Sequence, residues 1–139
     1  MIAIDTNILT SVRSPVPSAN RVAIASLAKF SAQGPMCVCG AVFAELLGLP
    51  ATDLPTLRSM FMQLAIAIDW RLDQSDWETA GLAYQEYVVR RRSSGGGLPH
   101  LMLTDFIIGA HASVRGYSLL TLDGRLYRAA FPNLRIETP

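Results

Sequence analysis

Short apolar runs alternate with longer segments of helical periodicity along the chain. The first run, residues 2–5, is bounded by a turn-like Asp-Thr-Asn, which predicts a strand buried on both faces rather than an alternating surface strand. Further short runs predict strands at residues 36–39, 66–70, 118–121 and 134–136. Strands of this kind are typical of a parallel sheet that is covered by helices.

Between these runs, apolar residues recur at roughly helical spacing. Helices are expected over residues 20–31, 41–48 and 125–130, and in segments that begin near residue 52, at the Ser75-to-Glu78 capping sequence and at Thr104. The predicted inner faces carry Val22, Leu27 and Phe30; Leu57, Met60, Phe61 and Leu64; and Trp77, Gly81, Tyr84 and Val88. The Ser- and Gly-rich residues 93–97 predict a mobile loop. Alternation of strand and helix predicts an α/β fold with a parallel sheet covered on both faces.

Length and composition limit the classes of protein that the chain can represent. It has 139 residues, which predicts a single domain over residues 1–139. Half of the residues are hydrophobic and 17% are charged, so a homodimer or a bound partner protein is expected to cover apolar surface. The formal net charge of +1 excludes a broad basic field, and any contact with nucleic acid must therefore be local.

The cysteines and the apolar runs indicate the cellular compartment of the protein. Cys37 and Cys39 lie in one predicted strand and point to the same face, so they are expected to be buried thiols of a reducing compartment. No apolar run reaches about eighteen residues, and no basic segment precedes a long apolar stretch at the start. A soluble, cytoplasmic protein without a membrane segment is expected.

Most acidic residues have ordinary structural explanations. The chain has 11 Asp and Glu residues, and seven of them are expected at helix starts, in turns, on solvated faces or near the terminus: Asp53, Asp69, Asp73, Asp76, Glu78, Glu86 and Glu137. The other four lie inside or at the edge of apolar segments, where an unpaired carboxylate is costly: Asp5, Glu45, Asp105 and Asp123.

These four acids are predicted to meet at one edge of the sheet. Asp5 and Asp123 each follow a predicted strand, and Glu45 and Asp105 lie near the starts of helices that begin from the same edge, where open parallel sheets bind ligands. Capping could explain Asp105 and Asp123 separately, but it does not explain Glu45 between apolar neighbours. Clustered carboxylates need a cation, and ligation by oxygen alone favours Mg²⁺ or Mn²⁺. Phosphodiester hydrolysis is the expected chemistry.

Four sequence segments resemble the ordered motifs of PIN-domain proteins. The segments are IDTNIL at residues 4–9, AELL at 44–47, TDFIIGAHA at 104–112 and LTLDGRLY at 120–127. Chain length and the ending FPNL at 131–134 resemble the VapC-type toxins of bacterial toxin–antitoxin pairs in particular. One departure is Gly109, where many relatives have a larger residue, and we expect it to ease close packing rather than to alter chemistry.

The resemblance implies a three-layer α/β/α sandwich and a Mg²⁺- or Mn²⁺-dependent endoribonuclease with a cognate antitoxin as partner. The implied metal ligands and catalytic residues are Asp5, Glu45, Asp105 and Asp123, and the side chains that would orient ligands or water are Thr6, Asn7 and Thr121. His100 and His111 are assigned no catalytic role, because His111 is six positions beyond Asp105 and is displaced around and along the helix.

Arginine side chains are candidates for contact with RNA. The chain has a single lysine, Lys29, and arginine offers the planar fork that pairs bidentately with phosphate. The candidates are Arg13, Arg90, Arg91, Arg92, Arg125 and Arg128. For the run at residues 90–92, favourable interaction of cations with a helix C-terminus is an equally good explanation.

Two other functions fit parts of the pattern. A metal-dependent phosphatase of the haloacid dehalogenase type also begins with an Asp after its first strand, but it needs a second Asp where this chain has Asn7. A PIN-like module that binds RNA or protein without cutting is the other alternative. The presence of all four acids favours the nuclease.

Overall fold

A five-stranded parallel sheet forms the centre of the computed structural model, which describes residues 1–95 and 103–139. The strands are β1 (Ile2–Ile4), β2 (Met36–Cys39), β3 (Ile66–Asp69), β4 (Ser118–Leu120) and β5 (Ile136–Glu137). Their order is β3-β2-β1-β4-β5, and each neighbouring pair is parallel. Ile2 of β1 is aligned with both Met36 of β2 and Ser118 of β4. The predicted parallel sheet is therefore confirmed, although the last strand begins at Ile136 instead of residue 134.

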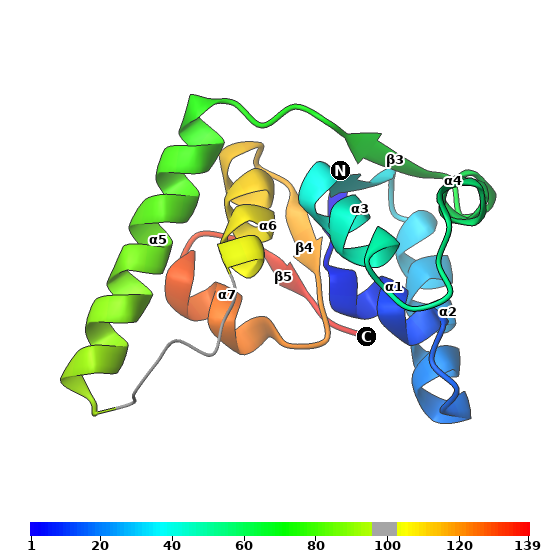
Figure 1. Cartoon of the computed structure of the whole chain (residues 1–139), viewed down its shortest axis with the longest axis horizontal. Helices are drawn as coiled ribbons and strands as arrows, with labels where there is room; N and C mark the ends of the chain where they lie inside the picture. The colour runs from blue at the N-terminus through cyan, green and yellow to red at the C-terminus, as the bar shows by residue number, and fades with distance from the viewer. Residues whose placement is uncertain (96–102) are drawn as a thin grey trace.

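Helices cover both faces of this sheet. They are α1 (Thr6–Val12), α2 (Pro17–Ser31), α3 (Gly40–Leu47), α4 (Leu54–Gln63), α5 (Gln74–Ser93), α6 (Leu103–Val114) and α7 (Gly124–Ala130). Figure 1 shows α1 and α2 on one side of the strands and α5, α6 and α7 on the other. The α/β class and the three-layer sandwich predicted from the sequence are confirmed.

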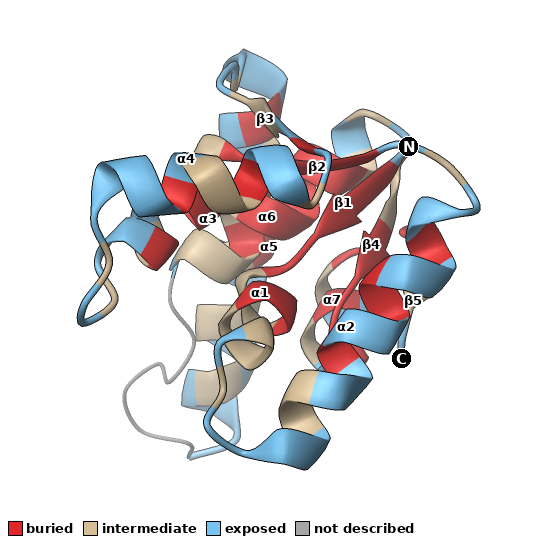
Figure 2. Cartoon of the chain, turned by 90° about the vertical axis from the view of Figure 1, so that its right-hand side faces the viewer, coloured by how far each residue is buried: buried red, intermediate tan, exposed pale blue. Residues whose placement is uncertain are grey.

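Buried positions concentrate on the central strands and on the helix faces toward them (Figure 2). All residues of β1 and β2 are buried, as a parallel sheet covered on both faces requires. Cys37 and Cys39 are free and buried, as predicted. Burial raises the pKa of the Cys37 thiol to about 11, so this thiol stays protonated at neutral pH.

The first helix, α1, is absent from the sequence-based prediction. Asp5 is its N-cap residue, and Ile8 and Leu9 are its buried positions. The Asp-Thr-Asn after β1 indicated a turn, but the chain continues directly into a helix. A helix with so few buried positions gives little periodicity to detect.

The start of α5 also differs from the prediction. Asp73 caps the helix, and Asp76 completes the capping box that was assigned to Ser75 and Glu78. The inner face shifts with it: Ala80 and Ala83 are buried, while Trp77 is 53% exposed. The predicted stripe is therefore wrong at Trp77 and Gly81, which are exposed, whereas Tyr84 packs against the core as predicted.

Smaller shifts occur in two other helices. In α2 the buried residues are Ala23, Ser26, Leu27 and Phe30, while Val22 is exposed. Helix α6 begins at Leu103, so Thr104 lies in its first turn instead of at the cap. His100 and residues 96–97 of the predicted loop lie outside the described residues. Of the rest of that loop, Ser93 is instead the last residue of α5 and Ser94 is its C-cap. Among the helices described, none combines the length and hydrophobicity needed to span a membrane.

Candidate active site

The candidate site lies where the carboxyl end of β1 meets that of β4. Strand β1 is the central strand, with β2 on one side and β4 on the other. The strand order reverses direction between β1 and β4, so their carboxyl ends form a topological switch point. Asp5 directly follows β1 and is 4% exposed. Its amide donates a 3.0 Å hydrogen bond to the Leu120 carbonyl at the end of β4. The first predicted acid is thus buried at the expected edge.

Two polar side chains fix the orientation of the Asp5 carboxylate. Asn7 Nδ2 and Thr121 Oγ1 each donate a 2.7 Å hydrogen bond to Asp5 Oδ2. Asn7 is held in turn, because its Oδ1 accepts a 3.0 Å hydrogen bond from the Leu122 amide. The Thr121 hydroxyl also accepts a 3.2 Å hydrogen bond from the Asp123 amide. The ends of β1 and β4 therefore form one polar network around a single carboxylate.

Glu45 and Asp105 reach the site from two further helices. Glu45 lies on α3, which begins immediately after β2, and its Oε2 accepts a short hydrogen bond from the Thr6 hydroxyl at the start of α1. Asp105 lies in the first turn of α6 and is half-buried. Asp105 thus lies near a helix start, as predicted, but Glu45 lies in the last turn of α3, because that helix has only eight residues.

Three of the acids act electrostatically on the buried hydroxyl of Tyr127. Burial raises its pKa most, and negative charges on Asp5, Asp105 and Glu45 raise it further. The ring belongs to α7 and is 2% exposed. Three carboxylates from three different elements therefore lie within electrostatic reach of one buried hydroxyl. Tyr127 lies in the LTLDGRLY segment at residues 120–127, but no role was predicted for it from the sequence.

The Tyr127 hydroxyl has no hydrogen-bond partner of normal geometry among the described residues. It nevertheless lies close enough to Asp5 for each group to affect the pKa of the other. The sequence does contain one indication that Tyr127 lies near the site. Tyr127 follows Asp123 by one helical turn and lies on the side of α7 that faces the core.

Asp123 has a different environment from the other three acids. It is exposed, and its carboxylate accepts a 3.0 Å hydrogen bond from the Arg125 amide, so it is the N-cap of α7. Capping was the ordinary explanation considered for this residue. Asp123 still lies at the same sheet edge, because its own amide is bonded to Thr121.

The carboxylates of the site suit a hard divalent cation by their chemistry. Burial raises the pKa of Asp5, and the charge of Glu45 adds to this effect, so a nearby cation would favour the ionised form. The hydrogen bonds from Asn7 Nδ2 and Thr121 Oγ1 both end on Asp5 Oδ2. Within residues 1–95 and 103–139, however, no three His, Cys, Asp or Glu side chains are close enough to hold an ion as they stand.

The candidate RNA-contacting arginines do not form one cluster. Arg13 is the C-cap of α1 and donates to the Thr52 hydroxyl, while Arg125 and Arg128 are exposed on α7. Residues 90–92 form the last turn of α5, where Arg90 lies 3.5 Å from Glu86. The interaction of these cations with the C-terminus of α5 is therefore consistent with their position.

A second polar cluster joins β3, α5 and α6. Arg115 Nε lies 2.9 Å from Asp69 Oδ2, and its Nη1 is bonded to Asp76 Oδ1. His111 is 1% exposed, and its Nε2 lies 3.2 Å from the same Asp69 oxygen. His111 is thus packed in the interior as a partner of Asp69. Asp69 and Asp76 were explained as turn and first-turn residues, but they are partners of Arg115 in a partly buried ion network.

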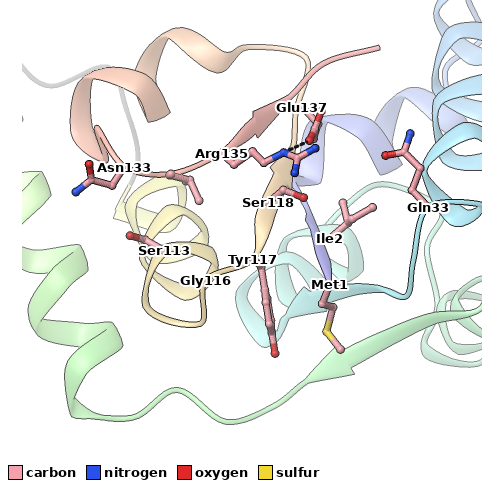
Figure 3. A pocket seen from close by; sticks show the side chains of 11 residues that line it. Met1, Ile2, Gln33, Ser113, Gly116, Tyr117, Ser118, Asn133, Arg135 and Glu137 are labelled. Carbon is pink, nitrogen blue, oxygen red and sulfur yellow. Dashed lines mark hydrogen bonds and ion pairs between the residues drawn. The ribbon is translucent and has the colours of Figure 1, made fainter.

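A cavity of about 370 Å³ opens at the opposite edge of the sheet. Figure 3 shows Met1, Ile2 and Ser118 around it, at the amino ends of β1 and β4. The Arg135–Glu137 ion pair, 2.6 Å long, lies on its wall. Because the acids lie at the carboxyl ends of the same strands, this cavity is separate from the candidate site.

Comparison with known proteins agrees with this arrangement. The PIN domain family model matches residues 2–132, and the chain therefore belongs to the PIN-domain family. Comparison with curated proteins gave no match.

Similar solved structures are complexes of toxins with antitoxins. VapBC2 from Rickettsia felis, bound to a DNA fragment from the promoter, is 20% identical, with a TM-score of 0.63 and coverage of 99% of this chain and 98% of that chain. A toxin–antitoxin complex from Klebsiella pneumoniae is 23% identical, with a TM-score of 0.64 and coverage of 100% and 98%. FitAcB from Neisseria gonorrhoeae is 18% identical, with a TM-score of 0.64 and coverage of 98% and 96%. At these identities the likeness shows the fold.

Proposed function

We propose that this chain is a Mg²⁺- or Mn²⁺-dependent endoribonuclease and the toxin of a type II toxin–antitoxin pair. The observation that carries the proposal is the buried Asp5 carboxylate, held by Asn7 and Thr121 at the switch point of a PIN-domain sheet. Further support is that Glu45, Asp105 and Asp5 all act electrostatically on Tyr127. Acids gathered in this way suit a divalent cation and phosphodiester chemistry.

The proposed ligands are Asp5, Glu45, Asp105 and Asp123. When bound, the cation supplies Lewis acidity, which activates water for attack on phosphorus and offsets charge on the leaving oxygen. Asn7 and Thr121 keep the Asp5 carboxylate in one orientation, and Thr6 does the same for Glu45. Carboxylates fixed in this way would hold the cation at little reorganisation cost.

RNA is the proposed substrate, and arginine side chains are proposed to hold its backbone. Arg125 and Arg128 are exposed on α7, the helix that starts at Asp123. Arg13 lies at the end of α1, the helix that starts after Asp5. The run at residues 90–92 lies in the last turn of α5, and a phosphate bound by Arg90 would compete with Glu86.

Cleavage of RNA by acid-to-amide variants tests the proposal. The parent chain is expected to cut RNA with Mg²⁺ or Mn²⁺ and to stop when EDTA is added. Asp5→Asn and Asp105→Asn should reduce the rate by a factor on the order of a hundred or more, because each removes a charged ligand. Glu78→Gln, an exposed acid on α5, is the matched control and should cut at the parent rate. Equal rates for Asp5→Asn and the parent would refute the metal site.

A cognate antitoxin is the proposed partner. The support is that similarly folded proteins from Rickettsia felis and Klebsiella pneumoniae were solved as complexes of this kind. Expression of this chain alone should arrest bacterial growth, and co-expression of a neighbouring antitoxin gene should relieve the arrest. The Asp5→Asn variant should be harmless without the antitoxin. A homodimer is also proposed, and light scattering of the purified chain tests it directly.

Binding without cleavage is the second candidate function. It is favoured by one observation: within the described residues, the acids do not form a ready ligand cluster, and Asp123 is engaged in capping α7. A parent chain that binds RNA but cuts none of it with either cation would support this candidate over the nuclease.

A further inference from the structure

The Tyr127 hydroxyl is an unusual feature of the protein interior. Within residues 1–95 and 103–139, it is the only buried side-chain nitrogen or oxygen atom without a hydrogen-bond partner. Buried hydroxyl groups are normally paired, because burying one unpaired disfavours folding. A phenylalanine would fill the same space without this cost. The hydroxyl therefore has a use that packing of the ring does not explain.

The surroundings of the hydroxyl indicate what that use is. Asp5, Asp105 and Glu45 all act on it electrostatically, and they come from three different elements. A tyrosine hydroxyl carries its proton at neutral pH, so it can donate one hydrogen bond to a nearby carboxylate. The hydroxyl thus offers one donor to a group of acceptors.

Asp5 is the acceptor that fits best. Its Oδ2 already accepts hydrogen bonds from Asn7 and Thr121. Tyr127 already acts on Asp5 as a hydrogen-bond donor does, because, like Thr121, it opposes the rise that burial causes in the pKa of that carboxyl. After burial, the charge of Asp5 has the largest effect on the pKa of Tyr127. A donor from α7 would fix the remaining degree of freedom of this carboxylate.

We propose that Tyr127 is a positioning residue of the metal site, whose hydroxyl donates a hydrogen bond to the Asp5 carboxylate when that carboxylate ligates a divalent cation. This role rests on the metal-dependent function proposed above. Hydrogen bonds from a neighbouring side chain orient ligating carboxylates, and their loss typically lowers metal affinity by a factor of about 10 to 100. Tyr127 would act through Asp5 and would not touch the substrate.

Tyr127→Phe is the decisive variant, because it keeps the ring and removes the hydroxyl oxygen. Without divalent cations, its melting temperature should equal or exceed that of the parent, since an unpaired buried polar group is lost. In calorimetric titration, its affinity for Mn²⁺ should fall on the order of tenfold. The rise in melting temperature that Mn²⁺ gives the parent should shrink accordingly.

Tyr117→Phe is the matched control. Tyr117 is half-buried and lines the cavity at the opposite edge of the sheet, so loss of its hydroxyl should leave Mn²⁺ affinity unchanged. Equal Mn²⁺ affinity of Tyr127→Phe and the parent would overturn the positioning role. A lower ion-free melting temperature without a change in affinity would also overturn it, because the hydroxyl would then be purely structural.

Asp5→Asn separates failure of this role from failure of the proposed function. If the parent binds Mn²⁺, Asp5→Asn abolishes binding and Tyr127→Phe does not weaken it, only the role of Tyr127 is wrong. If the parent binds no Mn²⁺, or Asp5→Asn binds it as tightly as the parent, the metal site is wrong and the role of Tyr127 fails with it.

Discussion

The Thr121 hydroxyl donates a 2.7 Å hydrogen bond to Asp5 Oδ2 across 116 positions of sequence. Thr121 is fully buried and Asp5 is 4% exposed, so water has little access to this bond. The bond joins the residues that follow β1 and β4, the central strand and one of its neighbours. The carboxylate at the centre of the candidate site therefore depends on a threonine from the other end of the chain.

Thr121→Val should destabilise the fold by about 1–3 kcal/mol, because it leaves the buried Asp5 carboxylate with one fewer donor. The Asp123 amide also loses its acceptor in this variant. Thr121→Ser keeps the hydroxyl and should recover most of the lost stability. Urea unfolding of the three proteins in EDTA measures the difference. If Val and Ser variants unfold at the same urea concentration, the hydrogen bond contributes little and the methyl group matters instead.

Arg115→Met should be far more destabilising than its partly exposed position suggests. Asp76 is 1% exposed, and removing Arg115 would leave that carboxylate buried without its cation. Breaking one partner of a buried pair typically costs about 3–5 kcal/mol. Arg90→Met removes an exposed arginine from its pair with Glu86 and should change stability by less than about 1 kcal/mol. Similar unfolding free energies for the two variants would contradict the buried role of Arg115.

His111 should make stability depend on pH. Burial lowers the pKa of His111 below its ordinary value of 6.5, although the hydrogen bond to Asp69 opposes this shift. Below pH 6.5 the unfolded chain binds a proton that the folded chain resists, so stability falls as the pH falls.

His111→Gln isolates this effect, because its amide can still donate to Asp69 and does not titrate. Relative to this variant, the parent should lose at most about 1.4 kcal/mol of unfolding free energy for each pH unit below its ordinary pKa. Guanidinium unfolding at several pH values between about 5 and 7.5 measures the slope. A parent and variant with parallel pH profiles would mean that His111 titrates normally in the folded protein.

The parallel sheet was predictable because its central strands are continuously apolar. Residues 36–39 and 118–121 read as buried strands, and β2 and β4 lie within them. Once the sheet is parallel, every residue that directly follows a strand lies at one edge. This geometric rule placed Asp5 and Asp123 at the same edge before any contact was known.

Features that depend on distant partners could not be predicted. Asp76 looked like an ordinary residue of a first helical turn, and its burial depends on Arg115, 39 positions later. The start of α5 had two acceptable caps two residues apart. Asp73 is the cap, and Asp76, which completes its capping box, is also bonded to Arg115. The unpaired state of the Tyr127 hydroxyl is a property of the surrounding atoms, and no spacing rule in the sequence encodes it.

Gly109→Ala should destabilise the protein even though alanine is the better helix former. A Cβ at Gly109 would lie 2.2 Å from Cε2 of Phe131, whose ring is 5% exposed and has little room to move. This agrees with the expectation that Gly109 allows close packing. Overpacking of this kind costs about 1–3 kcal/mol.

Gly81→Ala should stabilise the protein, in contrast to Gly109→Ala. Gly81 is an exposed glycine of α5, and a Cβ there would meet no atom within 4 Å. Its replacement should stabilise the protein by up to about 1 kcal/mol through helix propensity alone. Urea midpoints compared at constant m value give both effects. If both alanine variants were more stable than the parent, α6 could move away from Phe131, and the close contact would not constrain the position of Asp105 on the same helix.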